Sequence, residues 1–244
     1  MKRPAAMLAT GWIAAVLLIA AGCALGSWQL RRMHLKQAMR AQVAEVLRVR
    51  TARPLASAAD PARRLRYDWA AGAGVFLPRP AWLLDNQQRA GRVGVRVFRL
   101  FQPHGARVPL LIEMGWLPFA AGRQLPPIAP PPSGAVAVRG LLLPPPSPGL
   151  LAGAGTAGAD GAQLVIALEP AKIAASAGLA AIAPRVLRLD PALPIGHVRD
   201  LDVLPNTLPP ERHLGYAVQW FALAAAVFCI ALLLTLRHFR RLRP

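Results

Sequence analysis

Cysteine is nearly absent from this sequence. The two that occur, Cys23 and Cys229, both lie inside long apolar stretches, and the segment between those stretches has none. That segment can therefore form no internal disulfide and no cysteine-based zinc site. Apart from His213 at its end, its histidines, His34, His104 and His197, are isolated and lack metal-ligand spacing. It also lacks the GxSxG, HExxH and Walker signatures, so we expect a protein that is not an enzyme.

Acidic residues are also scarce. The 244 residues include 11 Asp and Glu against 29 Lys and Arg, which gives a formal net charge of +18. The basic residues are scattered among prolines and apolar segments, with no basic helix and no RNA-binding motif. The charge therefore does not indicate a nucleic-acid partner. The acids on predicted strands, Asp68, Asp85 and Glu113, are expected to cap turns or pair with arginines. A glycine-rich run at residues 153–158 lies in a Pro/Gly-rich loop and is only a weak phosphate-binding signal.

Charge is missing altogether from two long stretches, one near each end of the sequence. A bilayer core about 30 Å thick needs about 20 helical residues at about 1.5 Å each, so both stretches can span a membrane. We predict an N-terminal segment (residues 1–9), a first span (10–30), an extramembrane domain (31–213), a second span (214–236) and a basic tail (237–244).

The basic start and apolar run also resemble a cleaved signal peptide, and "AAGC", ending at Cys23, resembles a lipoprotein cleavage site. The apolar run continues past Cys23 to Leu30, beyond the roughly 7–15 residues of a signal-peptide core. Gly22 and Gly26 form a GxxxG pair, which lets a second helix approach closely. We therefore expect a retained anchor with Cys23 as a small packing residue.

The basic residues beside the two spans predict their orientation. The tail "RHFRRLRP" follows the second span, and Lys2 and Arg3 precede the first. Two spans place both flanks on one side, and the positive-inside rule makes that side the cytoplasm. The basic residues after the first span point the other way, but they lead into a large domain, and long domains translocate largely regardless of charge. We predict that the middle domain lies outside the cytoplasm.

The start of the middle domain continues the first helix. Residues 31–49 contain no glycine or proline and are rich in helix formers, which predicts a charged helical stalk. Strand-like segments separated by turn residues follow at 65–76, 81–86, 93–102, 108–117, 136–143 and 163–169. Alternation in the third segment places Val95, Val97 and Arg99 on one face and Phe98 and Leu100 on the other.

Turn residues connect these segments. Residues 90–92 and 103–107 predict hairpins, residues 124–135 and 143–162 are Pro/Gly-rich loops, and a short helix is expected over residues 170–179. The predicted fold class is a membrane α+β protein. Two transmembrane helices flank an antiparallel β-rich domain, a small barrel or sandwich, with one or two short helices.

The second span begins beside a histidine. His213, Ala217, Trp220 and Ala224 share one helical face, with the imidazole at the aqueous edge and small residues beneath it. A neutral imidazole can ligate haem iron, and alanines let a flat macrocycle lie against a helix. Alternatively, His213 and Tyr216 only mark the membrane interface, where polar and aromatic residues are common. On the residues alone the interface interpretation is the simpler one.

Two motifs at the membrane edges add a resemblance. "LGSWQLRRMHLK" is similar to the G-x-W-Q-x-x-R-x-x-x-K signature of the surfeit locus protein one family, and "RHLGYAVQWFALA" resembles that family's second-helix signature, a histidine followed by Y-A-x-Q-W-F. "GVFLPRPAWLLDNQQRAGRVGVRVFRLFQP" and "VPLLIEMGWLP" match its central strands, so the resemblance covers nearly the whole chain. The sequence departs from the family at Gln87 and Met114, where arginine is usual.

The resemblance implies a function. Members are assembly factors for haem–copper cytochrome c oxidase, and bacterial members are implied to bind haem a and assist its insertion into the catalytic subunit. It implies a bacterial inner-membrane protein with its main domain in the periplasm. The implied partners are the oxidase catalytic subunit, the haem a synthase and the lipid bilayer.

The candidate haem-binding residues lie at the two membrane edges: Trp28, Gln29 and Arg32 on the first helix, and Arg212, His213, Tyr216 and Trp220 on the second. The resemblance implies that His213 is the axial ligand of the iron, and Arg32 and Arg212 are expected to pair with the propionates. Two alternatives stay open: a scaffold that binds oxidase subunits without haem, and an envelope lipoprotein modified at Cys23.

Overall fold

A computed structural model describes residues 3–125, 127–146, 156–157, 161–204 and 207–241. The chain divides into two compact units. The helix unit comprises Met1–Arg40 and Thr207–Pro244, and the barrel unit comprises Ala41–Asn206. Lys2, Arg243 and most of the glycine-rich run at 153–158 lie outside the described residues.

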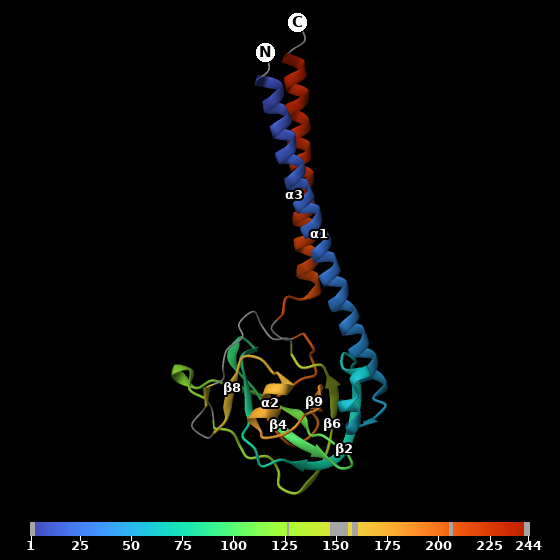
Figure 1. Ribbon diagram of the computed structural model, residues 1–244, viewed down its shortest axis with the longest axis vertical. Helices are drawn as coiled ribbons and strands as arrows, with labels where there is room; N and C mark the ends of the chain where they lie inside the picture. Colours follow the sequence, from blue (N-terminus) through green and yellow to red (C-terminus); the bar gives the residue numbers. More distant parts are fainter. Residues whose placement is uncertain (1–2, 126, 147–155, 158–160, 205–206, 242–244) are drawn as a thin grey trace. The chain divides into compact units, whose positions relative to one another are not determined.

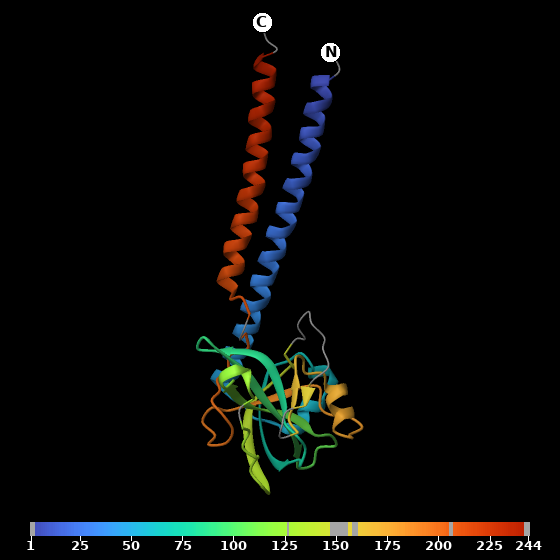
Figure 2. The same cartoon turned by 90° about the vertical axis from the view of Figure 1, so that its left-hand side faces the viewer.

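The helix unit pairs the two ends of the chain. Helix α1 spans Arg3–Val49 and α3 spans Pro210–Arg241, and they run side by side with the start of α1 and the end of α3 at the same end of the pair (Figures 1 and 2). Both are long and apolar enough to cross a membrane, which indicates a membrane protein. At about 1.5 Å per residue, the 47 residues of α1 extend about 70 Å, so the predicted stalk over 31–49 is part of one continuous helix.

Small side chains mark the interface of α1 and α3. The buried positions of each helix recur at spacings of three, four and seven, which is the seam of a two-helix coil: Ala15, Gly22, Gly26, Met33 and Lys36 on α1, and Pro210, His213, Ala217 and Ala224 on α3. A Cβ added at Gly22 would lie 3.1 Å from the Ala224 Cβ, and one at Gly26 would lie 2.8 Å from the Phe221 ring. The GxxxG pair therefore lets the helices approach, as the sequence predicts.

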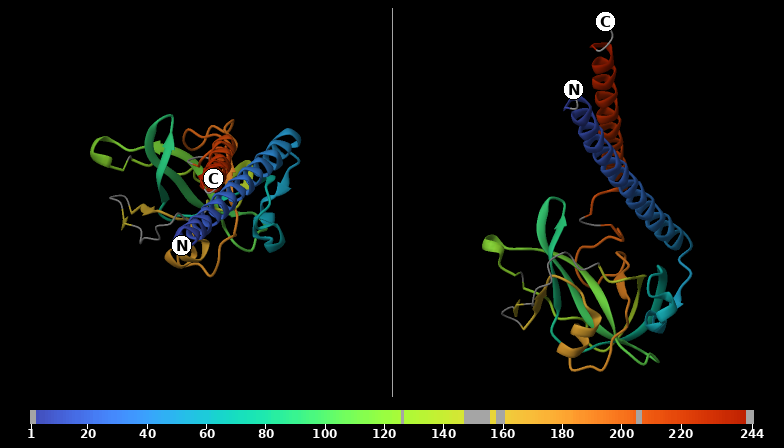
Figure 3. Two further views of the ribbon diagram at one scale, coloured as in Figure 1. Left: turned by 90° about the horizontal axis from the view of Figure 1, so that it is seen from above. Right: turned by 45° about the horizontal axis from the view of Figure 1, so that its top comes forward.

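The barrel unit contains nine described strands in one sheet. They are β1 (Arg53–Pro54), β2 (Asp68–Phe76), β3 (Trp82–Arg89), β4 (Arg92–Pro103), β5 (Leu110–Pro118), β6 (Ala135–Leu143), β7 (Thr156–Ala157), β8 (Gln163–Val165) and β9 (Val186–Leu189). Their order is β1-β2-β6-β9-β5-β4-β3-β8-β7, and β2 also pairs with β4. That extra pairing closes β2, β6, β9, β5 and β4 into a small barrel (Figures 1 and 3).

The short helices are the 3-10 turns Leu55–Ala59, Pro61–Arg63 and Ala121–Arg123, and α2 (Pro170–Ser176). The predicted hairpins at 90–92 and 103–107 connect β3 to β4 and β4 to β5. Gly91 and Gly105 have φ of 74° and 72° at these turns, which glycine adopts without strain. The predicted helix after residue 169 is α2. These local predictions are confirmed.

The sheet differs from the predicted antiparallel arrangement in two respects. Three of its pairings are parallel: β1 with β2, β3 with β8, and β5 with β9. Strand β9 was not predicted, because all four of its residues are buried and show no alternation, and prolines at 184 and 191 flank it. The predicted strand at 163–169 forms a ladder only over Gln163–Val165.

The two faces of β4 point into different apolar clusters, as the alternation predicts. Val95 and Val97 belong to a cluster with members from all five strands of the closed ring, so it fills the barrel interior. Phe98 and Leu100 pack outside the ring with residues of α2, including Ile173. A third cluster packs the end of α1 against the outer side of β6. The barrel thus has one inner core and two outer ones.

Candidate functional site

The strongest candidate site is built around His213 in the first turn of α3. Pro210 begins that helix, which suits a residue without a backbone N–H, and Glu211 follows where negative charge stabilises a helix start. One turn on, the His213 side chain faces α1 and is only 7% exposed. A histidine that merely marked the membrane interface would be expected to keep its polar tip in water.

Gln29 of α1 fixes the orientation of this imidazole. The His213 Nδ1 and the Gln29 Oε1 lie 2.7 Å apart. The Gln29 oxygen can only accept, so Nδ1 carries the proton and Nε2 of a neutral ring is left with a free lone pair. Metal-binding histidines have the same arrangement: one ring nitrogen donates a hydrogen bond, and the other nitrogen ligates the metal.

The other nitrogen of His213 is left without a partner. Its Nε2 is buried and has no hydrogen-bond partner among the residues that the structure describes. Buried polar atoms are nearly always satisfied, and an exception calls for a ligand, an ion or a water molecule. The pair His213–Gln29 therefore presents one oriented, unsatisfied nitrogen.

Polar contacts brace the start of α3 against α1. The Lys36 Nζ donates a hydrogen bond to the Leu208 carbonyl, and the Arg40 Nη1 lies 3.3 Å from the Glu211 Oε1. The sequence marks Lys36 as the last residue of the first-helix motif, and in the structure it holds the segment that leads into α3.

The structure brings only some of the predicted site residues together. Gln29 contacts His213, and Trp220 is partly buried on the same side of α3. Trp28 and Tyr216 are exposed by 47% and 43%. Arg32 and Arg212 are exposed too, and neither forms an ion pair within the described part of the chain. The aromatic and cationic candidates are thus free to contact a ligand, but no direct contact joins them to His213.

One expected feature of the haem site differs. Ala217 and Ala224, on which a macrocycle was expected to lie, are buried against α1, with Gly22 packed on Ala224. A ring system therefore has no access to this stretch of α3 within the packed helix pair. Access is left to the edge of the pair, where exposed Trp28 and Tyr216 lie close in sequence to the hydrogen-bonded Gln29 and His213.

The donor set at this edge suits haem better than a bare metal ion. The described residues contain no group of three or more His, Cys, Asp or Glu side chains that could hold a metal ion. Haem supplies four of its own nitrogen ligands and needs from the protein only an axial donor and partners for its propionates. An oriented imidazole with free guanidinium groups nearby in the sequence provides these.

The strand-borne acids act as structural hubs, as expected. Glu113 accepts from Arg96 at 2.6 Å and from Arg188 at 2.9 Å, with all three side chains buried. Asp68 pairs with Arg53, Arg63 and the buried Arg185. Asp85 pairs with Arg123 at 2.6 Å. These are the arginine pairs that the sequence predicts for the three carboxylates.

The two departures from the family pattern lie close together in the barrel. The Trp116 Nε1 donates to the Gln87 carbonyl at 2.9 Å. Met114, two residues earlier on β5, occupies a bulge and belongs to the inner core. Met114 also lines a pocket with His197 and Arg99, which no sequence motif marks. One feature of the sequence could have indicated this pocket: strand alternation places Arg99 on the same face of β4 as Val97.

Comparison with known proteins gives one positive result. No curated protein sequence matches this chain significantly. A sequence model of the SURF1 family matches residues 16–225, which run from within α1 through the barrel unit and into α3. Both membrane-edge motifs, the Gln29–His213 pair and all nine strands fall inside that match. The chain therefore belongs to the SURF1 family, whose general role is the assembly of cytochrome oxidase.

Proposed function

We propose that this protein assembles cytochrome c oxidase by holding haem a at the membrane edge and assisting its insertion into the catalytic subunit. The observation that carries the proposal is the His213 imidazole: buried, oriented by Gln29 through Nδ1, and unsatisfied at Nε2. The haem a synthase, as donor, and the catalytic subunit, as acceptor, are the proposed partners.

Each residue of the site has a proposed part. His213 ligates the iron through Nε2, and Gln29 holds the ring in the ligating tautomer. Arg32 and Arg212 pair with the propionate carboxylates. Trp28, Tyr216 and Trp220 supply aromatic surface beside the macrocycle. Haem a is cargo here, and the redox chemistry of its iron serves the oxidase.

Assembly factors of this family are not enzymes, and holding a cofactor requires no catalytic residue. The two spans and the basic tail after α3 support a bacterial inner-membrane location with the barrel unit in the periplasm. On that side of the membrane, the His213 edge lies at the boundary between bilayer and water. A haem could pass there between membrane partners without crossing the membrane.

The test is an absorption spectrum of the detergent-purified full chain after co-expression with haem a synthesis. The wild type is expected to carry a haem a band that His213→Ala loses or shifts. His34→Ala is the matched control, because His34 is an exposed histidine of α1 and should retain the band. Gln29→Leu should weaken haem retention, since the tautomer is no longer fixed. Equal haem content in wild type and His213→Ala would remove the ligand role.

One observation favours the scaffold alternative. The small-residue face of α3 packs against α1 and is closed to a macrocycle. A scaffold would need only the helix pair as an anchor and the barrel surface as its binding site. In that case cells that produce the His213→Ala variant would assemble oxidase normally. Substitutions on the barrel surface would abolish assembly.

A further inference from the structure

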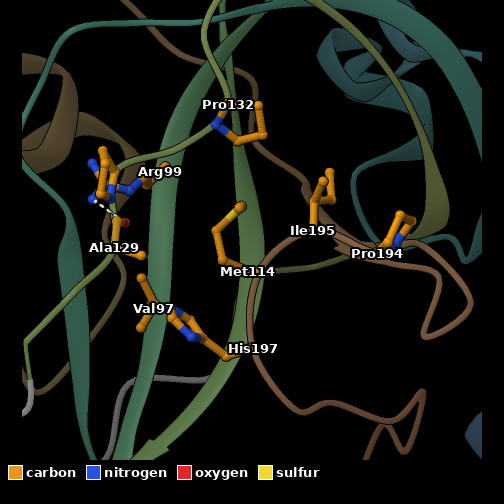
Figure 4. A pocket seen from close by; sticks show the side chains of 10 residues that line it. Val97, Arg99, Met114, Ala129, Pro132, Pro194, Ile195 and His197 are labelled. Carbon is orange, nitrogen blue, oxygen red and sulfur yellow. Dashed lines mark hydrogen bonds between the residues drawn. The ribbon is translucent and has the colours of Figure 1, made fainter.

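A pocket of about 280 Å³ lies at the barrel wall, within the barrel unit. Its lining comes from β4 and β5 and from the segments around residues 129–132 and 194–197. Figure 4 shows Met114 central in it, with Arg99 and Ala129 to one side, Pro194 and Ile195 to the other, and His197 below. None of these residues belongs to the proposed haem site, so a function of this pocket does not depend on haem binding.

The wall formed by residues 193–198 is fixed by backbone contacts. The Arg199 guanidinium donates five hydrogen bonds, all of them to carbonyl oxygens of Asp190, Leu193, Ile195 and His197. The His197 N–H donates to the Met114 carbonyl at 2.7 Å. The pocket is therefore a built feature of the fold, which lowers the entropic cost of binding a ligand.

Arg99, which lines this pocket, differs from other partly buried arginines of the barrel unit in its lack of a carboxylate partner among the described residues. Five arginines with partly or fully buried side chains each pair with a carboxylate: Arg63, Arg89, Arg96, Arg185 and Arg188. Arg99 is also partly buried, but it has no carboxylate partner among the described residues. The only hydrogen bond of Arg99 found there runs from its Nη2 to the Ala129 carbonyl at 3.2 Å. Arg199 differs from Arg99, because the charges of Asp190 and Glu113 act on its guanidinium.

Positive charge therefore collects at this pocket. Burial lowers the pKa of His197 most, and the charges of Arg99 and Arg199 lower it further. The Asp190 and Glu113 carboxylates offset the charge of Arg199, so Arg99 is the cation that lacks a counterion here. A half-buried cation without a counterion favours an anion from outside, and a guanidinium matches a carboxylate in shape as well as charge.

Polar surface at Arg99 and His197 faces an apolar wall, which is formed by Val97, Met114, Pro130, Pro132, Pro194 and Ile195. With a liquid water molecule taking about 30 Å³, the cavity holds a group of roughly ten non-hydrogen atoms. An inorganic anion would leave the apolar wall unused, and a neutral apolar group would leave Arg99 uncompensated. The chemistry that uses both is an apolar group ending in a carboxylate.

We propose that this pocket binds a carboxylate borne on a small apolar group, with Arg99 as the partner of the carboxylate. Two sources share this chemistry: a free short-chain acid, and the C-terminal residue of a protein partner whose last side chain is apolar. Met114 contacts the apolar part in either case.

The test is calorimetric titration of the full chain in detergent. The first probe is 4-methylpentanoate, compared with its neutral amide. The second is an acetylated tripeptide ending in leucine, with a free or an amidated C-terminus. The acid forms are expected to bind at least about tenfold more tightly than the amides. Tighter binding of the free peptide than of the acid identifies a protein C-terminus, and the reverse identifies a free acid.

Variants locate the site. Arg99→Gln should weaken acid binding about tenfold or more, whereas Arg107→Gln, an exposed arginine in the β4–β5 turn, should bind like wild type. Ala129→Phe fills the pocket from an exposed loop position and should abolish binding with Arg99 intact. Circular dichroism establishes that each variant is folded. The proposal is overturned if no probe binds, if the amides bind as well as the acids, or if folded Arg99→Gln binds normally.

Discussion

The interface of α1 and α3 is mostly small and apolar, with Lys36 and His213 as its buried polar side chains, whereas the barrel unit buries clusters of arginine and carboxylate. In the helix pair, the buried polar side chains Lys36 and His213 each make one hydrogen bond to a neutral group. In the described part of the barrel, the three buried carboxylates, Asp68, Glu113 and Asp190, all pair with arginine.

The difference separates structural from functional polar groups. Where charges only stabilise a fold, each is compensated, because an isolated buried charge is very costly. Where a buried polar group is left incomplete, a further partner is expected. Among the described residues, four buried side-chain atoms have no hydrogen-bond partner: Ser57 Oγ, Arg96 Nε, Arg185 Nε and His213 Nε2. Arg96 and Arg185 each pair with a carboxylate through another nitrogen. We therefore expect further partners at Nε2 of His213 and at the Arg99 pocket. Substitutions in the barrel and in the helix pair can test the two kinds of region separately.

The largest stability effect is expected at Glu113. Glu113→Gln leaves Arg96 and Arg188 buried without a countercharge and should destabilise the barrel unit by about 3–5 kcal/mol. Glu169→Gln is the control, since Glu169 forms an exposed pair with Lys172 and should change stability by less than about 1 kcal/mol. Denaturant unfolding of the purified protein measures both. If Glu113→Gln lowered the free energy of unfolding as little as Glu169→Gln does, the ion pairs of Glu113 would not be a major source of stability.

The helix pair should respond to volume rather than charge. Gly26→Leu places a side chain against the Phe221 ring and should destabilise the packed pair by about 1–3 kcal/mol. Gly11→Leu, in the same helix, is the matched control, because nothing lies within 4 Å of a Cβ at Gly11. Thermal unfolding midpoints in detergent compare the two. A fall of equal size for Gly11→Leu would contradict close packing at Gly26.

Acid should weaken the barrel through its paired carboxylates. Burial opposes ionisation of Asp68 most strongly, but hydrogen bonds and charge from Arg63 and Arg185 outweigh it, so its pKa lies below the ordinary 3.8. A lowered folded-state pKa means that stabilisation is complete above 3.8 and is lost as the pH falls through the folded value. Asp68→Asn should therefore lose less stability than wild type between pH 5 and pH 2. Parallel pH profiles would rule out this contribution.

The smallest effect is expected where the charges are exposed. Arg40 and Glu211 form a 3.3 Å pair with both side chains largely in solvent. Water screens such a pair, so Arg40→Gln should shift the unfolding free energy by less than about 0.5 kcal/mol. A loss as large as that of Gly26→Leu would mean that this pair, and not small-residue packing, holds the start of α3.

Local features could be predicted from the sequence. The stalk over 31–49, the hairpins and α2 follow from helix formers, turn glycines and a proline at a helix start, which act within a few residues. The inward and outward faces of β4 follow from strand alternation. Strand β9 could not be found, because a short strand buried on both faces has no period to detect.

Contacts between residues far apart in the chain could not be predicted from the sequence. Gln29 and His213 were each recognised as candidates, but their hydrogen bond joins residues 184 positions apart and depends on how the helices pack. Covering of Ala217 and Ala224 by α1 was missed for the same reason. The Arg99 pocket requires β4, β5 and the segment ending at His197 to meet, and no local pattern encodes that meeting.

The central claim is that the free nitrogen of His213 serves haem a delivery. The most direct measurement is the haem a content of cytochrome oxidase in membranes of cells that rely on this protein, with wild type, His213→Ala and His34→Ala produced at equal levels. The account predicts oxidase deficient in haem a with His213→Ala and normal content with His34→Ala. Full haem a content with His213→Ala would contradict it.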